Sequence, residues 1–239
     1  MKYEFTGETK VVDGRTLKRI RALTTIAGVV MYGECGGWIE KEANLAQVSG
    51  NAWVSGNARV YGNARVYGDA QVYGNAQVYG NTQVYGNARV YGDAQVYGDA
   101  QVSGDAWVSG NAWVYGNAFV YSNAWVYGNA SVYGNAWVSG NAWVYGNAQV
   151  YGNAQVYGNT QVYSNARVYG NAQVSVSPVV VSGMRYTITV SDNMLAADCQ
   201  NWTFNEWRSK TEDEIHKMDR DSAVEFYPKL IAILDLLGK

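Results

Sequence analysis

The sequence predicts an all-β protein built as a parallel β-solenoid, in which short strands are wound into stacked coils. Three observations predict this fold. From Ala46 to Ser175 a six-residue unit, Ala-x-Val-Tyr-Gly-Asn, repeats with few departures and without an insertion. Val recurs at every sixth position from Val48 to Val174, which makes twenty-two units. A short fixed period of this kind is the sequence signature of a solenoid.

The unit itself accounts for the shape of each coil. In Ala-x-Val-Tyr the side chains alternate along a strand, so Ala and Val point inward while x and Tyr point outward. Gly and Asn follow, and both tolerate left-handed backbone angles, so the chain turns a corner there. Three units close a coil of eighteen residues. We therefore expect about seven triangular coils, stacked about 4.8 Å apart.

Two parts of this pattern resemble known families. The aliphatic residue and the small residue in each unit resemble the left-handed parallel β-helix of hexapeptide-repeat proteins, such as bacterial acyltransferases and the γ-class carbonic anhydrases. That resemblance implies left-handed winding. The stretch Gly-Gly-Trp-Ile-Glu-Lys-Glu-Ala-Asn-Leu before the repeats, with the Gly-Asn-Ala-x-Val-Tyr units after it, resembles hexapeptide-repeat proteins of bacteria and their phages or prophages. This second group implies no agreed activity.

Residues 1–45 precede the repeats and predict an N-terminal β cap. Alternating apolar residues flank Asp13-Gly14, a dipeptide typical of tight hairpin turns. An open solenoid end exposes unpaired backbone and apolar core, so a covering element is expected there. We predict a β-hairpin over the first coil, and the solenoid proper over residues 46–175.

Residues 176–239 predict a small C-terminal cap of strands and helices. The segment from Val179 to Val190 indicates one or two closing strands. Capping-box patterns at Thr211 and Ser222 predict the starts of two helices, and Pro228 is expected to kink or restart the second. The second helix has an apolar stripe, which we expect to pack over the last coil.

Composition and charge limit the classes of function. No apolar run reaches the roughly 18 residues of a membrane span, and the N-terminus lacks the apolar core of a signal peptide, so we expect a cytoplasmic protein with no membrane partner. Cys35 and Cys199 lie on opposite sides of the repeats and are expected to be free thiols. The net charge is −2 and the repeats hold no basic stripe, which argues against nucleic acid as a partner.

The sequence predicts no enzyme, no cofactor and no metal site. The resemblance to carbonic anhydrases implies three histidine ligands, and the resemblance to acyltransferases implies a histidine base with loops that interrupt the coils. This chain has one histidine, His216, in a predicted helix, and its repeats run without a loop. Asp93 and Asp99 lie at consecutive corners, but calcium needs six or more convergent oxygens.

The outward x column changes character in the middle of the repeats. Elsewhere it carries mainly Gln and Arg, but six of seven consecutive x positions from residue 107 to 143 are aromatic. Residues eighteen apart share a face, and exposed aromatic patches commonly mark interfaces. We predict a binding surface made of this aromatic belt and two tyrosines beside it: Trp107, Trp113, Phe119, Trp125, Trp137, Trp143, Tyr127 and Tyr145.

Several functional hypotheses remain open. The first is a non-enzymatic scaffold, phage- or prophage-encoded, whose belt contacts a protein: its own copies, or a host protein such as a defence protein. A second is a glycan-binding tail or surface component, in which Trp and Tyr stack on sugar rings. A hexapeptide acyltransferase-like enzyme is the third. A further possibility is that the aromatic belt has only a structural role, since stacked aromatic side chains stabilise flat sheets.

Overall fold

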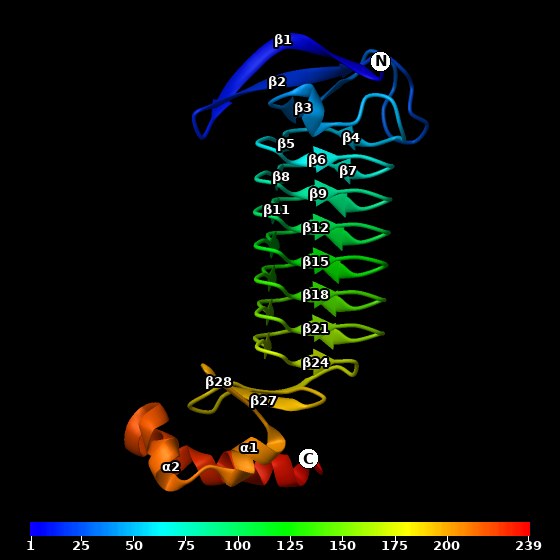
Figure 1. The fold of residues 1–239 in the computed structure, drawn as a ribbon. Helices are drawn as coiled ribbons and strands as arrows, with labels where there is room; N and C mark the ends of the chain where they lie inside the picture. The colour runs from blue at the N-terminus through cyan, green and yellow to red at the C-terminus, as the bar shows by residue number, and fades with distance from the viewer.

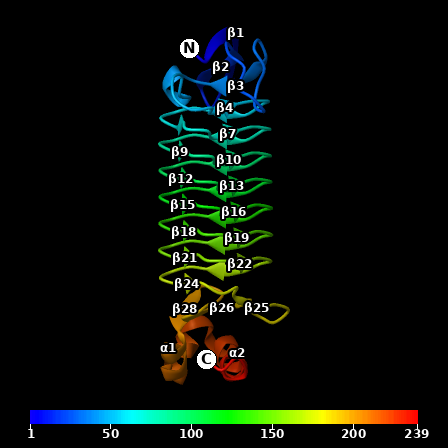
Figure 2. The same ribbon diagram turned by 90° about the vertical axis from the view of Figure 1, so that its right-hand side faces the viewer.

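The computed structural model describes all 239 residues as an elongated β-solenoid with a cap at each end (Figure 1). The parallel β-solenoid and the N-terminal hairpin are therefore confirmed. Two-residue strands stack in three parallel sheets, which form the three faces of the prism, as the second view also shows (Figure 2). Seven such strands line each face, and an additional turn through the N-terminal cap brings the total to about eight. The left-handed winding stays a prediction.

Each face is defined by its strands. The first face consists of β4 (Trp53–Val54), β7 (Gln71–Val72), β10 (Arg89–Val90), β13 (Trp107–Val108), β16 (Trp125–Val126), β19 (Trp143–Val144) and β22 (Gln161–Val162). The second face consists of β5 (Arg59–Val60), β8 (Gln77–Val78), β11 (Gln95–Val96), β14 (Trp113–Val114), β17 (Ser131–Val132), β20 (Gln149–Val150) and β23 (Arg167–Val168). The third face consists of β6 (Arg65–Val66), β9 (Gln83–Val84), β12 (Gln101–Val102), β15 (Phe119–Val120), β18 (Trp137–Val138), β21 (Gln155–Val156) and β24 (Gln173–Val174).

The solenoid core is built from the inward Ala and Val columns. From Ala52 to Val174 these side chains are essentially inaccessible to solvent. Thr82 and Thr160 replace Ala in the core, and each hydroxyl donates to the backbone carbonyl three residues earlier, at 2.7 and 2.6 Å. The two buried hydroxyl groups therefore satisfy their hydrogen-bonding need inside the coil.

The prediction that the first valine of the repeats, Val48, points inward is wrong. Val48 is 97% exposed, and Leu45 takes its place by pairing with Val66 in the third face. The cause is Gln47, whose amide oxygen accepts from the backbone N–H of Lys2 and whose amide nitrogen donates to the carbonyl of Tyr3. Residues 46–51 are thus drawn to the edge of the hairpin, and the regular coil begins at β4.

The N-terminal cap is the predicted hairpin, extended by a third strand. β1 (Tyr3–Val12) and β2 (Arg15–Ala22) pair antiparallel, and β3 (Cys35–Ile39) joins β2 to the parallel strand β5. The short 3₁₀ helix η1 (Glu42–Asn44) follows. Tyr3 packs edge-on against the fully buried Trp53, with 6.5 Å between the ring centroids. The hairpin therefore closes the apolar end of the prism.

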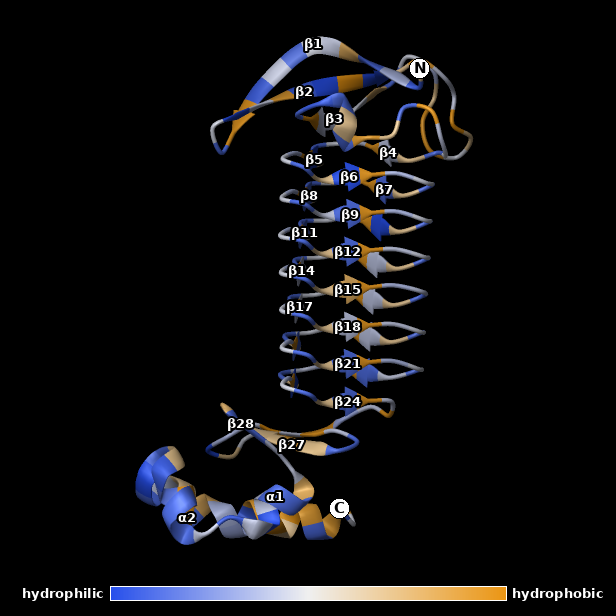
Figure 3. Ribbon diagram, viewed as in Figure 1, coloured by the Kyte–Doolittle hydropathy of each residue, from blue (hydrophilic) through white to orange (hydrophobic).

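The C-terminal cap is a four-stranded antiparallel sheet covered by helices. The sheet contains β25 (Val179–Val181), β26 (Ile188–Val190), β27 (Met194–Ala197) and β28 (Gln200–Thr203). The helices are α1 (Phe204–Ser209) and α2 (Glu212–Leu236). They lie beyond the sheet at the end of the molecule, and the apolar residues of α2 gather in its C-terminal half (Figure 3).

The expectation that a helix packs over the last coil is wrong. Val180 and Met194 of the sheet contact the solenoid core, whereas Leu230 and Leu234 of α2 belong to a separate apolar cluster on the sheet's other side. The sheet closes the coil because its loops supply side chains to the open edge: Asp192 accepts from the backbone N–H of Ser175 at 2.7 Å. The helices instead form a second small core with the outer side of this sheet.

The predicted helix starts are partly confirmed. Thr211 caps α2, and its hydroxyl accepts from the backbone N–H of Glu214. The break between two helical segments lies at Asp219-Arg220, before Ser222, and Pro228 lies inside the second segment. The short α1, which Thr203 caps in the same way, was not predicted. No helix combines the length and apolar character that a membrane crossing requires. Cys35 and Cys199 are exposed free thiols, as expected.

Candidate interaction surface

Three tryptophans of the belt form one column on the first face. Trp107 pairs with Trp125 across β13 and β16, and Trp125 pairs with Trp143 across β16 and β19. The rings stack almost parallel, with centroids 4.6 and 5.1 Å apart and interplanar angles of 4° and 7°. The predicted sharing of one face is confirmed. The stacked Val residues of the core set the distance between coils, and that distance sets the spacing of the indole rings.

This stacking decides which part of each ring meets solvent. Each indole covers the face of its neighbour, and the guanidinium of Arg89 lies 5.0 Å from the ring centroid of Trp107. Solvent therefore meets mainly the ring edges of Trp107 and Trp125, while Trp143, at the end of the stack, has Gln161 on its other side. Trp143 is 37% exposed, while Trp107 and Trp125 are half-buried. The column presents a flat strip of indole edges along the prism.

The predicted tyrosines lie beside this strip. Tyr127 and Tyr145 stack on each other at 5.0 Å, and Tyr127 meets Trp143 edge-on at 6.4 Å. Ser109 occupies the same column beside Trp107 and is buried. The structure thus brings five of the eight predicted residues together on the first face.

The other three predicted residues lie on the remaining faces. Phe119 and Trp137 are neighbours on the third face, with centroids 5.5 Å apart and planes tilted by 59°. Trp113 stands alone on the second face between Gln95 and Ser131. Trp113 and Trp137 are each 44% exposed. The belt therefore surrounds the prism, and it is densest on the first face.

Charge is missing from the same part of the chain. Between Asp105 and Arg167 the sequence contains no Asp, Glu, Lys, Arg or His. Over more than three coils the outward side chains are aromatic rings, amides and hydroxyls. Charged residues are depleted, and Tyr and Trp enriched, at the cores of protein interfaces. The uncharged band and the aromatic belt coincide.

A second aromatic column was not singled out from the sequence. Seven tyrosines stack without interruption along the second face, with centroids 4.8–5.0 Å apart: Tyr61, Tyr79, Tyr97, Tyr115, Tyr133, Tyr151 and Tyr169. The sequence contained the information needed to find this column, because these residues are eighteen apart and the position is Tyr, never Ser, in every coil. The pKa of Tyr133 is raised to about 12, mainly by burial, and the neighbouring hydroxyls of Tyr151 and Tyr115 contribute to this rise. We call this column the tyrosine ladder.

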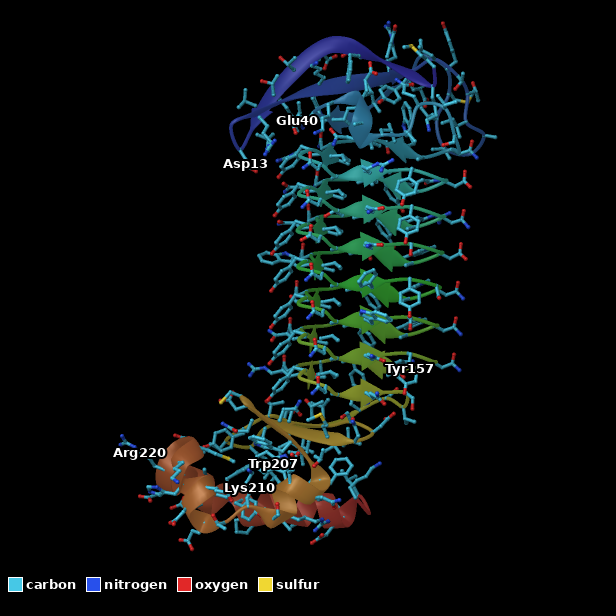
Figure 4. All side chains as sticks on the ribbon, viewed as in Figure 1. Asp13, Glu40, Tyr157, Trp207, Lys210 and Arg220 are labelled. Carbon is cyan, nitrogen blue, oxygen red and sulfur yellow. The ribbon has the colours of Figure 1, made fainter.

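The tyrosine ladder is attached to both caps. The hydroxyl of Tyr61 donates to Asp13 at the hairpin turn, at 3.1 Å, and that of Tyr169 donates to the carbonyl of Asp198, also at 3.1 Å. Figure 4 shows Asp13 at the end of the hairpin, above the edge of the coils. Burial is the main cause that raises the pKa of both terminal tyrosines. The ladder therefore connects the two ends of the molecule.

The single histidine lies apart from the belt. His216 is exposed on α2, with Nε2 3.3 Å from a carboxylate oxygen of Asp221. No three His, Cys, Asp or Glu side chains come together in the arrangement a metal ion would need.

The repeats match a known protein family. Ten segments between residues 46 and 176, several of them overlapping, match the model described as the YdcK beta solenoid repeat, and together they cover just over half of the chain. The chain belongs to the YdcK beta-solenoid repeat family. A search of the curated proteins found no match.

The matched YdcK repeats include most of the belt. Trp107 and Trp113 lie in the segment 100–116, and Trp125, Trp137 and Trp143 lie within 124–146. Phe119 falls between matched segments, and both caps lie outside them. The family description specifies a repeat fold and no activity.

Proposed function

We propose that this solenoid is a non-enzymatic scaffold whose aromatic belt contacts a protein partner. The observation that carries the proposal is the coincidence of the belt with an uncharged band, from Asp105 to Arg167, around the prism. A surface of this composition costs less to desolvate than a charged one, because only amides and hydroxyls, and no charged groups, lose water. The first face is the proposed centre, since Trp107, Trp125 and Trp143 form one strip there.

A second copy of the chain is the first candidate partner. A neutral, flat strip of ring edges is compatible with an identical strip, because neither copy brings a charge that the other must neutralise. A host protein is the second candidate. The resemblance of the repeats to proteins of bacteria and phages makes a phage-encoded protein with a bacterial target the setting for this alternative.

Glycan binding is supported by one residue. A sugar ring stacks on an aromatic face, and the ring faces that Trp107, Trp125 and Trp143 turn toward one another are covered. Trp113 has no aromatic neighbour above or below, since Gln95 and Ser131 flank it in the sheet. This geometry makes Trp113 the place to test for a carbohydrate, and it ranks the glycan behind a protein.

The test replaces the three stacked tryptophans with the residue that the repeat uses elsewhere. The variant Trp107→Gln, Trp125→Gln, Trp143→Gln should fold, because Gln occupies the equivalent outward position in β7 and β22. Sedimentation velocity over a concentration series should show that the parent chain associates and that the variant stays monomeric.

A matched control changes three outward residues of the second face. Gln77→Ser, Gln95→Ser and Gln149→Ser introduce the residue that already stands at Ser131 and should leave association unchanged. If the triple Trp variant melts normally and associates like the parent chain, the belt is not the interface between copies. Loss of association in both variants would also contradict the proposed role of the first face.

A further inference from the structure

A pocket of about 270 Å³ lies in the C-terminal cap, away from the aromatic belt. It opens between the sheet β25–β28 and helix α2, and most of its lining is apolar. Trp207, Ile215, Phe226 and Leu230 form its buried wall. Figure 4 shows Trp207 in the layer between the sheet and the helices. The YdcK repeats do not extend to this part of the chain.

One end of the pocket is polar. Tyr186, Asp198 and Asp219 line both the apolar pocket and an adjoining open depression over the second face of the solenoid. The hydroxyl of Tyr186 donates to the carboxylate of Asp219. That hydrogen bond is the main cause that lowers the pKa of Asp219. Donors and acceptors are therefore concentrated at the mouth, while the interior has few of them.

The mouth carries two opposite-charge pairs. Arg167 lies 3.2 Å from Asp198, and Arg185 lies 3.6 Å from Asp219. The amides of Asn147, Gln149 and Asn165 line the outer part of the depression. Since each arginine already faces a carboxylate, the mouth has no net charge to offer an ion. It suits an uncharged polar group that both donates and accepts hydrogen bonds.

The backbone around the mouth is strained. Asp198 and Arg220 adopt φ angles of 51° and 48°, in a region that residues other than glycine rarely occupy. Arg220 forms part of the break in α2, and Figure 4 places it at the outer turn of the helix. The break includes Asp219 and directly follows Met218, and both residues line the pocket. Backbone strain of this kind is often found at ligand sites, and in this protein it also occurs at the hairpin turn, at Asp13, and at two solenoid corners, Ser122 and Ser164.

The solenoid itself provides the contrast. Its Ala and Val columns fill the interior of every coil, as close-packed protein cores normally do. The small cap, by contrast, keeps an open apolar space between two layers. Apolar pockets with a few convergent polar groups are the usual form of small-molecule sites.

We propose that this pocket binds a small uncharged amphipathic molecule. Its apolar body, of about the size of a bicyclic aromatic ring system, occupies the space between the sheet and α2. Its polar end, a hydroxyl or an amide, lies at the mouth beside the hydrogen-bonded cluster of Arg185, Tyr186 and Asp219. This inference is independent of the proposed function of the belt.

The experiment uses 2-naphthol as the probe and the full chain as the protein. Calorimetry should show one saturable site, and binding of the anionic 2-naphthoate should be at least tenfold weaker because the mouth is neutral. The variant Ala223→Leu places a larger side chain in the pocket wall and should weaken 2-naphthol binding at least tenfold. The triple Trp→Gln variant of the belt should bind the probe like the parent chain.

A second measurement does not depend on filling the pocket. In the Cys35→Ser background the remaining thiol, Cys199, lines the pocket and is accessible to solvent. Saturating 2-naphthol should slow alkylation of Cys199 several-fold. Absence of saturable binding, unchanged alkylation, or equal binding by a folded Ala223→Leu variant would each overturn the proposal. Should Ala223→Leu not fold, the alkylation rates alone decide.

Discussion

Ser122 and Ser164 stand at solenoid corners where the other repeats from Gly56 to Gly170 carry glycine. Both serines have φ angles of 60°, in the left-handed region. At the equivalent corner of Gly128, an added Cβ would lie 3.0 Å from the backbone nitrogen of Gly146 in the next coil. Ser122 therefore combines an unfavourable backbone angle with a close approach to the following coil, whereas Ser164, in the last coil, has only the unfavourable backbone angle.

Replacing these serines should stabilise the protein. Ser122→Gly and Ser164→Gly should each raise the free energy of unfolding by about 1 kcal/mol, because glycine adopts positive φ without a penalty. Thermal and denaturant unfolding would measure the change. The control is Ser131→Gly, which makes the same replacement in strand β17 and should destabilise. A gain in stability at Ser131 as large as at Ser122 would refute the backbone explanation.

At the scale of the elements, the corners are joined by ladders of side-chain amides. Asn111, Asn129, Asn147 and Asn165 form one such column, in which each Nδ2 donates to the Oδ1 of the next residue over 3.1–3.3 Å. Aspartates interrupt all three corner columns in one coil, at positions 93, 99 and 105. A carboxylate accepts from the preceding amide and has no proton to donate onward.

Each asparagine of this amide column should contribute to stability in proportion to the number of side-chain hydrogen bonds it makes. Asn129 makes two side-chain bonds and Asn165 makes one. Asn129→Ala should lower the free energy of unfolding by about 1 kcal/mol, and Asn165→Ala by about half as much. Chemical denaturation of the two variants provides the comparison. Equal losses would mean that the exposed amide bonds contribute nothing and that only the corner backbone matters.

The regular strands could be predicted from the sequence, and the irregular segments around them could not. The Val period was sufficient to predict the strands, because every coil repeats the same local geometry. The first unit failed because Gln47 hydrogen-bonds to Lys2 and Tyr3, a contact between distant segments that no period records. In the same way, the four-stranded cap and the pocket depend on side chains brought together from Tyr186 to Leu230. Spacing alone cannot place such residues.

At the scale of the whole molecule, the candidate belt could be located from the sequence because faces follow from the eighteen-residue coil. The sequence could not give the orientation of the rings. Parallel stacking turns the indole edges of Trp107, Trp125 and Trp143 outward, and this changes which partners fit. This orientation of the rings supports our proposal of a protein partner over a glycan, although both hypotheses start from the same residues.

Because of the tyrosine ladder, the stability of the whole molecule should vary with pH in the alkaline range. Burial raises the pKa of Tyr133 to about 12 and also raises the pKa values of Tyr97 and Tyr115. An unfolded tyrosine titrates near pH 10. Above that pH the unfolded chain loses phenolic protons before the folded chain does, so stability is complete below about pH 10 and falls as the pH rises towards 12.

The phenylalanine double variant isolates this effect. Tyr115→Phe with Tyr133→Phe keeps the stacked rings but removes two titrating hydroxyls from the ladder. The melting temperature of the parent chain should fall between about pH 10 and pH 12, and that of the variant should fall less over the same range. Tyr157→Phe with Tyr163→Phe, at two well-exposed tyrosines outside the ladder, should retain the steep dependence of the parent. An identical fall in all three proteins would show that the buried hydroxyls of the ladder do not control alkaline unfolding.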